Sequence, residues 1–239
     1  MTLTVLAAGS LKRAFTPLLA AFSEQTGVAV EVGFGPAGLL RERIEAGERC
    51  ALFASANTVH PQALLDVGRA RAIQVFAANA LSLTVRSTVP QGDWLTLLAD
   101  PMLRLGTSTP GCDPSGDYTW QLFAHLDTLR PGLGEQLRQR SQQLVGGRDS
   151  LTVPAKEIAS AWLIREGFTD MFIGYQHYTT LLAAERDVRV VDIPPEHNIR
   201  CNYALALLEE PAAPLMQFIV GSQGQACLRA AGFLPPQAE

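Results

Sequence analysis

The chain has 239 residues, of which 47% are hydrophobic and 18% charged, a composition typical of soluble globular proteins. This length suffices for one large or two modest domains with substantial cores. The 19 basic and 23 acidic residues give a net charge of −4 and form no basic stripe, which argues against a nucleic-acid partner. No apolar run reaches the roughly 18 residues that a membrane-spanning helix requires.

Strand and helix signals alternate along nearly the whole chain, which predicts an α/β fold with mostly parallel sheets flanked by helices. In chain order, the predicted elements are strand 3–6, helix 11–25, strand 28–34, helix 39–45, strand 51–56, helix 60–65, strand 73–76, strand 80–86, helix 94–98, strand 104–107, helix 118–129, helix 131–143, helix 158–166, strand 171–175, helix 178–184, strand 188–193, strand 202–208, helix 213–220 and helix 222–231.

The segments 80–86 (ALSLTVR) and 202–208 (NYALALL) are predicted to be alternating strands, and the first of them alternates apolar and polar residues. We interpret them as the segments where the chain crosses between two lobes. Lobe one is then expected to contain residues 1–80 plus 203–239, and lobe two residues 81–202. A chain that crosses twice predicts a hinge with a ligand-binding cleft.

Two predicted strands end in small-residue turns that open helices, at residues 7–10 (AAGS) and 35–38 (GPAG). Such turns present backbone N–H groups at the positive end of a helix dipole, beyond the carboxyl end of the strand. This arrangement binds anions without a charged side chain. The hydroxyl of Ser10 is expected either to cap its helix or to donate to a ligand, and the sequence favours neither.

A third glycine-containing turn follows the strand at 104–107 and carries several hydroxyl groups and two acids. The backbone N–H groups at Ser115 and Gly116 are expected just before the next helix, where they could hold an anion. We predict that Asp113 and Asp117 are capping or turn residues rather than acid–base catalysts. Tyr175, at the end of a later strand, is expected either to donate its phenol to an oxyanion or to pack with its hydroxyl in water.

Enzyme and metal signatures are absent from the sequence, which has no nucleophile elbow, Walker loop or dinucleotide-binding fingerprint. The four histidines include no pair at i, i+4 spacing, so neither a metal site nor a cofactor is expected. An enzyme that uses Asp113, Asp117 or Cys112 is a disfavoured alternative. The four scattered cysteines are predicted to be small buried hydrophobes, with one disulfide left open for an exported protein; they are Cys50, Cys112, Cys201 and Cys227.

Five segments in the same order resemble the molybdate-binding proteins of ABC importers. These segments are residues 7–11, 35–47, 52–57, 113–118 and 224–235. The resemblance implies a two-lobed periplasmic-binding fold that closes on a tetrahedral oxyanion, molybdate or tungstate, with hydroxyl and backbone N–H donors and no counter-ion. It also implies a monomer whose partners are the small oxyanion and a membrane permease.

The resemblance also implies a set of ligand-binding residues. Ser10 matches a serine that binds through its hydroxyl and N–H, Ser115 matches a backbone donor, and Tyr175 matches a ligand tyrosine. Ala37 falls at the position of a second ligand serine, and the stretch around Ala155 and Lys156 matches another N–H donor.

Two positions depart from the family pattern. Ala37 keeps the backbone N–H but lacks the hydroxyl, and Ala51 replaces an aspartate. Loss of one charge-assisted hydrogen bond costs on the order of 1.5–3 kcal/mol. We therefore expect either a lower affinity for the oxyanion or a different ligand, with sulfate, phosphate and carboxylates as alternatives. Lys156 is hypothesised to supply a compensating positive charge.

The sequence does not specify the compartment. If a leader peptide ahead of Met1 has been removed, the protein is expected to be periplasmic; otherwise it is expected to be cytoplasmic. A cytoplasmic anion-sensing or scavenging protein of the same fold is therefore the alternative function.

Overall fold

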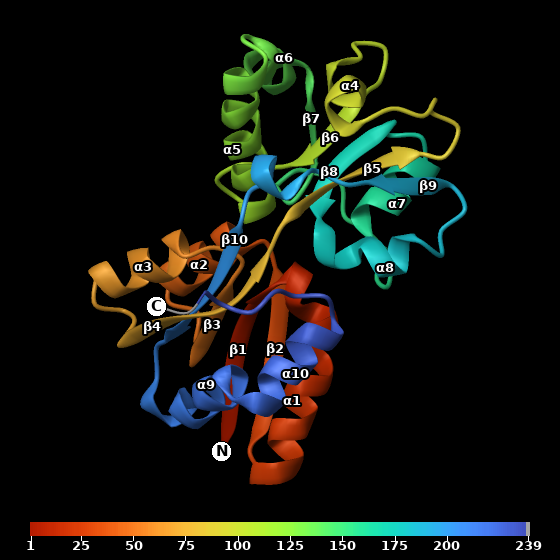
Figure 1. Ribbon diagram of the computed structural model, residues 1–239. Coiled ribbons are helices and arrows are strands. Elements are labelled where there is room, and N and C mark those ends of the chain that lie inside the picture. Colours follow the sequence, from red (N-terminus) through yellow and green to blue (C-terminus); the bar gives the residue numbers. More distant parts are fainter. Residues whose placement is uncertain (238–239) are drawn as a thin grey trace. The chain divides into compact units, whose positions relative to one another are not determined.

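The computed structural model describes residues 1–237. The chain forms two compact units, with unit 1 built from residues 1–79 and the chain from Cys201 onward, and unit 2 from Ala80–Arg200. Each unit contains one five-stranded sheet with helices on both faces (Figure 1). Two mixed sheets flanked by helices confirm the predicted fold class. Within the described chain, none of the helices is both long and apolar enough to cross a membrane.

In unit 1, the strand order is β2-β1-β3-β10-β4. Only β10 runs against the others, since β1 pairs in parallel with β2 and β3, and β10 pairs antiparallel with β3 and β4. Helix α1 packs with α9 and α10, and α2 packs with α3. The elements are β1 Thr2–Ala8, η1 Gly9–Leu11, α1 Lys12–Thr26, β2 Ala29–Gly35, α2 Ala37–Glu45, β3 Leu52–Ser55, α3 Val59–Asp66, β4 Ala72–Asn79, β10 Cys201–Leu207, η4 Glu210–Ala212, α9 Ala213–Val220 and α10 Ser222–Ala230.

In unit 2, the strand order is β7-β6-β8-β5-β9, and only β5 runs against the others. Helices α5 and α6 pack together, while α7 and α8 contact β8, β5 and β9. The elements are β5 Leu81–Arg86, α4 Trp94–Ala99, β6 Leu105–Ser108, α5 Pro114–Leu129, α6 Leu133–Arg140, β7 Gln142–Val145, α7 Ala159–Arg165, β8 Met171–Tyr175, η2 Gln176–Tyr178, α8 Thr179–Leu182, β9 Val188–Val191 and η3 Pro195–His197.

The core of each unit follows from the apolar periodicity of its elements. On α1, the buried side chains of Phe15, Leu18 and Phe22 recur at three- and four-residue spacing and form one face. The helix ends where Gly27 adopts a left-handed φ of 71° and its N–H bonds the carbonyl of Ser23. The inner strands of each sheet are largely buried, whereas the edge strands β2, β4, β7 and β9 are more exposed.

The predicted helix at 131–143 is wrong at its carboxyl end, where the chain forms the separate edge strand β7. Helix α6 ends at Arg140, and Ser141 adopts an extended conformation. Strand β7 is only four residues long and buries only Val145 fully. A strand so short and exposed leaves no alternating hydrophobic pattern to distinguish it from the end of an amphipathic helix.

Candidate functional site

The two turns that open α1 and α2 lie side by side at one edge of the unit 1 sheet. Strands β1 and β2 pair in parallel with Ala8 opposite Gly35, the last residue of each strand. The turn that contains Ser10 and the first residue of α2, Ala37, therefore leave the sheet at the same edge. The two turns are therefore adjacent, and a hydroxyl lies beside a helix N-terminus.

Ser10 lies in the short helical turn η1 and is half-buried. Its Oγ lies 2.8 Å from the phenol oxygen of Tyr203, a residue of β10 that is 193 positions away in sequence. Helix α1 begins at Lys12, with Leu11 as its N-cap and no side-chain cap hydrogen bond. The hydroxyl therefore does not cap α1, and its donation to a ligand stays a prediction.

Ala37 is the first residue of α2 and is fully buried. The preceding Pro36 is the N-cap residue, with extended backbone angles, and supplies no side-chain cap hydrogen bond. Since proline has no side-chain acceptor, no cap occupies the first-turn N–H groups of α2. These groups and the dipole of a nine-residue helix suit an anionic partner.

In unit 2, Ser115 follows β6 and Tyr175 is the last residue of β8, and these two strands are adjacent and parallel. Helix α5 begins at Pro114, so Ser115 lies in its first turn rather than ahead of it. The Ser115 N–H donates to Asp113 Oδ1 at 3.2 Å, which makes Asp113 the N-cap residue. An anion that binds this N–H must share it with the Asp113 carboxylate.

Both acids of this loop have structural partners, as predicted for capping and turn residues. Asp113 also accepts a hydrogen bond from Ser108 Oγ at 2.6 Å, and Asp117 accepts one from the Gly111 N–H at 2.9 Å. Burial raises the pKa of the Asp113 carboxyl above its ordinary value, and burial also raises the pKa of Asp117. An ionised Asp113 would repel a nearby anion, whereas a protonated Asp113 would not.

The loop after β6 is held against a glycine pair, Gly146 and Gly147, that follows β7. The Thr109 hydroxyl donates to the carbonyl of Val145 at 2.8 Å. A Cβ added to Gly146 would lie 2.6 Å from Asp113 Oδ2, and one added to Gly147 would lie 2.8 Å from Thr109 Oγ1. Because the glycines lack side chains, their backbone can approach Asp113 and Thr109 closely. This contact fixes Asp113, which in turn caps the N-terminus of α5.

Lys156 lies in the segment between β7 and α7, in a turn closed by a 3.1 Å hydrogen bond from the Glu157 N–H to the carbonyl of Pro154. Its φ is 72°, and it is the one non-glycine residue with a positive φ among the described residues. Non-glycine residues rarely adopt this conformation, which costs about 1 kcal/mol. The residue is exposed.

Tyr175 is the last residue of β8 and only 6% exposed. Its ring meets that of His177 edge to face, with 6.0 Å between the ring centroids. Strand β5 pairs with β8 so that Leu81 lies opposite Tyr175. The tyrosine therefore sits on a rigid strand end at the same edge as the N-terminus of α5.

The four cysteines are all free thiols, so residues 1–237 contain no disulfide. Cys50 and Cys201 are buried, as expected for small hydrophobes, whereas Cys112 and Cys227 are half-buried. Burial raises the pKa of the Cys50 thiol to about 12 and that of Cys201 well above its usual range. Among residues 1–237, no group of three or more His, Cys, Asp or Glu side chains is arranged to hold a metal ion.

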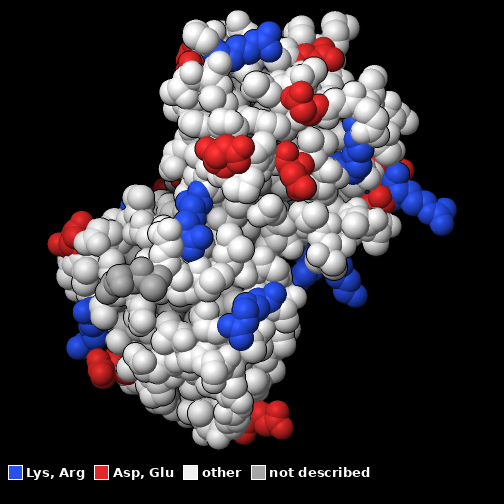
Figure 2. All heavy atoms as spheres, viewed as in Figure 1, with Lys and Arg blue, Asp and Glu red and all other residues white. Residues whose placement is uncertain are grey.

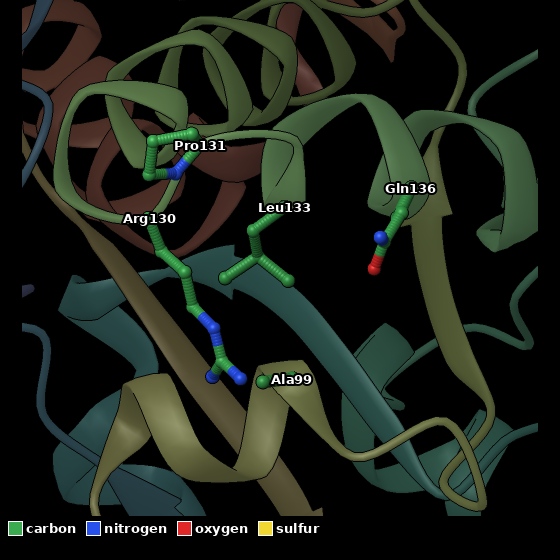
Figure 3. Close-up of a pocket in the computed structure, with 5 residues that line it drawn as sticks. All are labelled: Ala99, Arg130, Pro131, Leu133 and Gln136. Atoms are coloured by element: carbon green, nitrogen blue, oxygen red, sulfur yellow. The ribbon is translucent and has the colours of Figure 1, made fainter.

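A small surface pocket of about 110 Å³ lies elsewhere in unit 2 (Figure 3). Arg130, Leu133 and Gln136 project from the α5–α6 segment toward Ala99 of α4. None of the predicted ligand-binding residues lines it, and its volume is well below the range of about 300–1,000 Å³ typical of ligand pockets. On the face shown in Figure 2, basic and acidic side chains are interspersed without a single-sign patch.

The structure thus groups four of the five predicted residues in two pairs. Ser10 and Ala37 share one sheet edge in unit 1, and Ser115 and Tyr175 share one in unit 2, whereas Lys156 lies in a separate turn. Sequence reasoning missed Tyr203 and the Gly146–Gly147 pair. The glycine pair directly after an apolar residue was a usable turn signal, but nothing in the sequence linked Tyr203 to Ser10.

Residues 3–234 match the family model described as bacterial extracellular solute-binding protein. The chain belongs to this family. It is also 45% identical over 237 residues to an uncharacterized Pasteurella multocida protein, PM1146, covering 97% of this chain and 98% of that one.

Solved structures of solute-binding proteins share the fold. A periplasmic molybdate-binding protein from Azotobacter vinelandii is 23% identical, with a TM-score of 0.75 and coverage of 98% of this chain and 100% of that one. The sulfate-binding protein SubI from Mycobacterium tuberculosis is 17% identical, with a TM-score of 0.77 and coverage of 98% and 87%. At these identities the likeness establishes the fold and leaves the ligand to be argued from the site.

Proposed function

We propose that this solute-binding protein captures a small tetrahedral oxyanion, molybdate or tungstate, in the periplasm and delivers it to the permease of an ABC importer. The observation that carries the proposal is the in-register pairing of Ala8 with Gly35, which puts the Ser10 turn beside the side-chain-uncapped N-terminus of α2. Hydroxyl and backbone N–H donors without a counter-ion suit an anion that remains fully ionised at neutral pH.

The proposal rests on two groups of donors, each described within its own unit. Unit 1 carries the Ser10 hydroxyl and the Ala37 N–H, and unit 2 carries Ser115, Tyr175 and the turn at Lys156. Removing a dianion from water is costly, so several donors are needed at once. Two of the solved relatives are named for molybdate and sulfate, which supports an oxyanion and leaves the choice between them to experiment.

The decisive experiment measures thermal stability in the presence of molybdate, tungstate, sulfate, phosphate and small carboxylates, with chloride at matched ionic strength as the blank. A ligand at about 100 times its Kd stabilises the native state by about 2.7 kcal/mol, which raises Tm by roughly 5 °C or more in a chain of this size. Molybdate and tungstate are expected to give this rise, and sulfate and phosphate a smaller one.

Ser10→Ala is expected to reduce the Tm rise, while Thr16→Ala is the matched control. Thr16 is an exposed residue of α1 whose hydroxyl bonds the carbonyl of Lys12, within its own helix. A protein that responds to carboxylates alone, or to no oxyanion at millimolar concentration, would contradict the proposed function.

The contribution of the Lys156 charge can be separated from that of its backbone. Asparagine tolerates the left-handed conformation that Lys156 adopts, so Lys156→Asn removes the ammonium group and keeps the turn. If the charge compensates for the missing hydroxyl at Ala37, anion affinity is expected to fall by about three- to tenfold at low salt and by less at 0.15 M.

Calorimetric titration of Lys156→Asn, with Lys156→Arg as the charge-retaining control, measures this effect. Arginine is expected to keep near-wild-type affinity. Equal affinity of the asparagine variant and the wild type at low salt would contradict a role for the charge.

A further inference from the structure

Tyr203 holds the one hydroxyl group that the two paired turns of unit 1 present. Residues 7–10 and 35–38 contain a single side-chain hydroxyl, that of Ser10, because alanine occupies position 37. The Tyr203 phenol oxygen lies 2.8 Å from Ser10 Oγ. The direction in which Ser10 can donate therefore depends on a residue from a distant part of the chain.

The Tyr203 ring is held rigidly. The residue is fully buried, and its ring meets those of Phe76 and Phe233 edge to face, with centroid separations of 6.3 and 5.3 Å. The pairing of β10 with β4 shifts register between Tyr203 and Ala204, an irregularity of the kind that re-aims side chains. Packing and backbone together fix the position of the phenol oxygen.

At this distance either hydroxyl can donate to the other, and the chemistry of the two groups favours one direction. A phenol is a stronger acid than an aliphatic alcohol, so the favoured arrangement has Tyr203 donating to Ser10 Oγ. The hydrogen of Ser10 then points away from Tyr203. A hydroxyl that accepts one hydrogen bond also becomes a better donor in the next, because linked hydrogen bonds polarise one another.

We infer that Tyr203 is a positioning residue that orients and polarises the Ser10 hydroxyl as a donor to the bound oxyanion. This inference rests on the proposed function and assigns Tyr203 no contact with the ligand itself. A polarised Ser10 hydroxyl would donate a stronger hydrogen bond, which would offset the absence of a second hydroxyl at position 37.

The test compares anion affinities of the wild type, Tyr203→Phe, Ser10→Ala and the double variant by calorimetric titration with molybdate. Phenylalanine keeps the ring between Phe76 and Phe233 and removes only the hydroxyl. Tyr203→Phe is expected to weaken molybdate binding by about three- to tenfold. In the Ser10→Ala background, the same substitution is expected to have no further effect, because its partner is gone.

Thr26→Val is the matched control for lost stability. The Thr26 hydroxyl donates a 2.7 Å hydrogen bond to the carbonyl of Phe22, in the same unit and remote in sequence from both turns. Its loss is expected to lower Tm by an amount similar to that of Tyr203→Phe and to leave affinity unchanged.

The outcomes separate the two proposals. If the wild type binds no oxyanion, the proposed function fails. If the wild type binds molybdate but Tyr203→Phe binds it equally well, the inference fails while the function stands. Full additivity of the two substitutions also overturns the inference, since Tyr203 would then act independently of Ser10.

Discussion

Replacing Gly146 with alanine is expected to lower the free energy of unfolding by about 2–4 kcal/mol and to weaken anion binding. Gly146 has a φ of 76°, and an added Cβ would lie 2.6 Å from Asp113 Oδ2 and closer still to Ser108 Oγ. The substitution adds the left-handed backbone cost, about 1 kcal/mol, to a steric overlap worth about 1–3 kcal/mol. Relief requires Asp113 to move, and Asp113 caps the helix that carries Ser115.

Gly167→Ala provides the matched control, because it carries the left-handed backbone cost without the steric overlap. Gly167 has a similar φ of 80°, and no heavy atom lies within 4 Å of its added Cβ. Urea unfolding of this variant is expected to show a loss of about 1 kcal/mol and unchanged affinity. Equal losses in the two variants would contradict the claim that Gly146 is required by close packing against Asp113.

The sequence predicts most of the fold because hydrophobic patterns are local. The continuous apolar runs of β1 and β3 and the small-residue turns after β1 and β2 identify the elements around Ser10 and Ala37. Parallel strands adjacent in the chain then predict that these turns meet, as they do. Strand β7 was missed because one buried residue in four leaves no pattern.

The contacts that complete each site are not local and could not be predicted in the same way. Tyr203 lies in a mostly apolar strand, and the local sequence there gives no sign of its distant partner. Its hydrogen bond to Ser10 depends on strand order and on the register shift in β10, both of which are set by the whole sheet. Asp113 was recognisable as a cap residue because its partner, Ser115, is two positions away.

Acidification is expected to destabilise the protein through His60, a buried residue of α3. His60 is only 6% exposed, and neither ring nitrogen has a hydrogen-bond partner in the described structure. The pKa of His60 is lowered from 6.5 to about 4, chiefly by burial and also by the charge of Arg41, while Glu42 acts in the opposite direction. The imidazole is therefore neutral in the native state above about pH 4.

The sign of the effect follows from proton linkage. Between pH 6.5 and 4 the unfolded chain binds a proton at His60 and the native state does not, so stability falls as pH falls. The difference reaches at most about 3 kcal/mol at pH 4. His60→Leu removes the titrating group and two unpaired polar atoms at similar volume, so it is expected to raise stability at pH 7 by about 1 kcal/mol and to flatten the pH dependence.

His60→Gln distinguishes titration from polarity. Glutamine cannot be protonated in this range, so the stability of His60→Gln is expected to change with pH as little as that of His60→Leu. It still buries an amide without an evident partner, so its stability at pH 7 is expected to be lower than that of His60→Leu. Urea unfolding between pH 7 and 4.5 measures all three proteins. If His60→Leu loses as much stability over this interval as the wild type does, other groups cause the acid sensitivity and His60 is not its source.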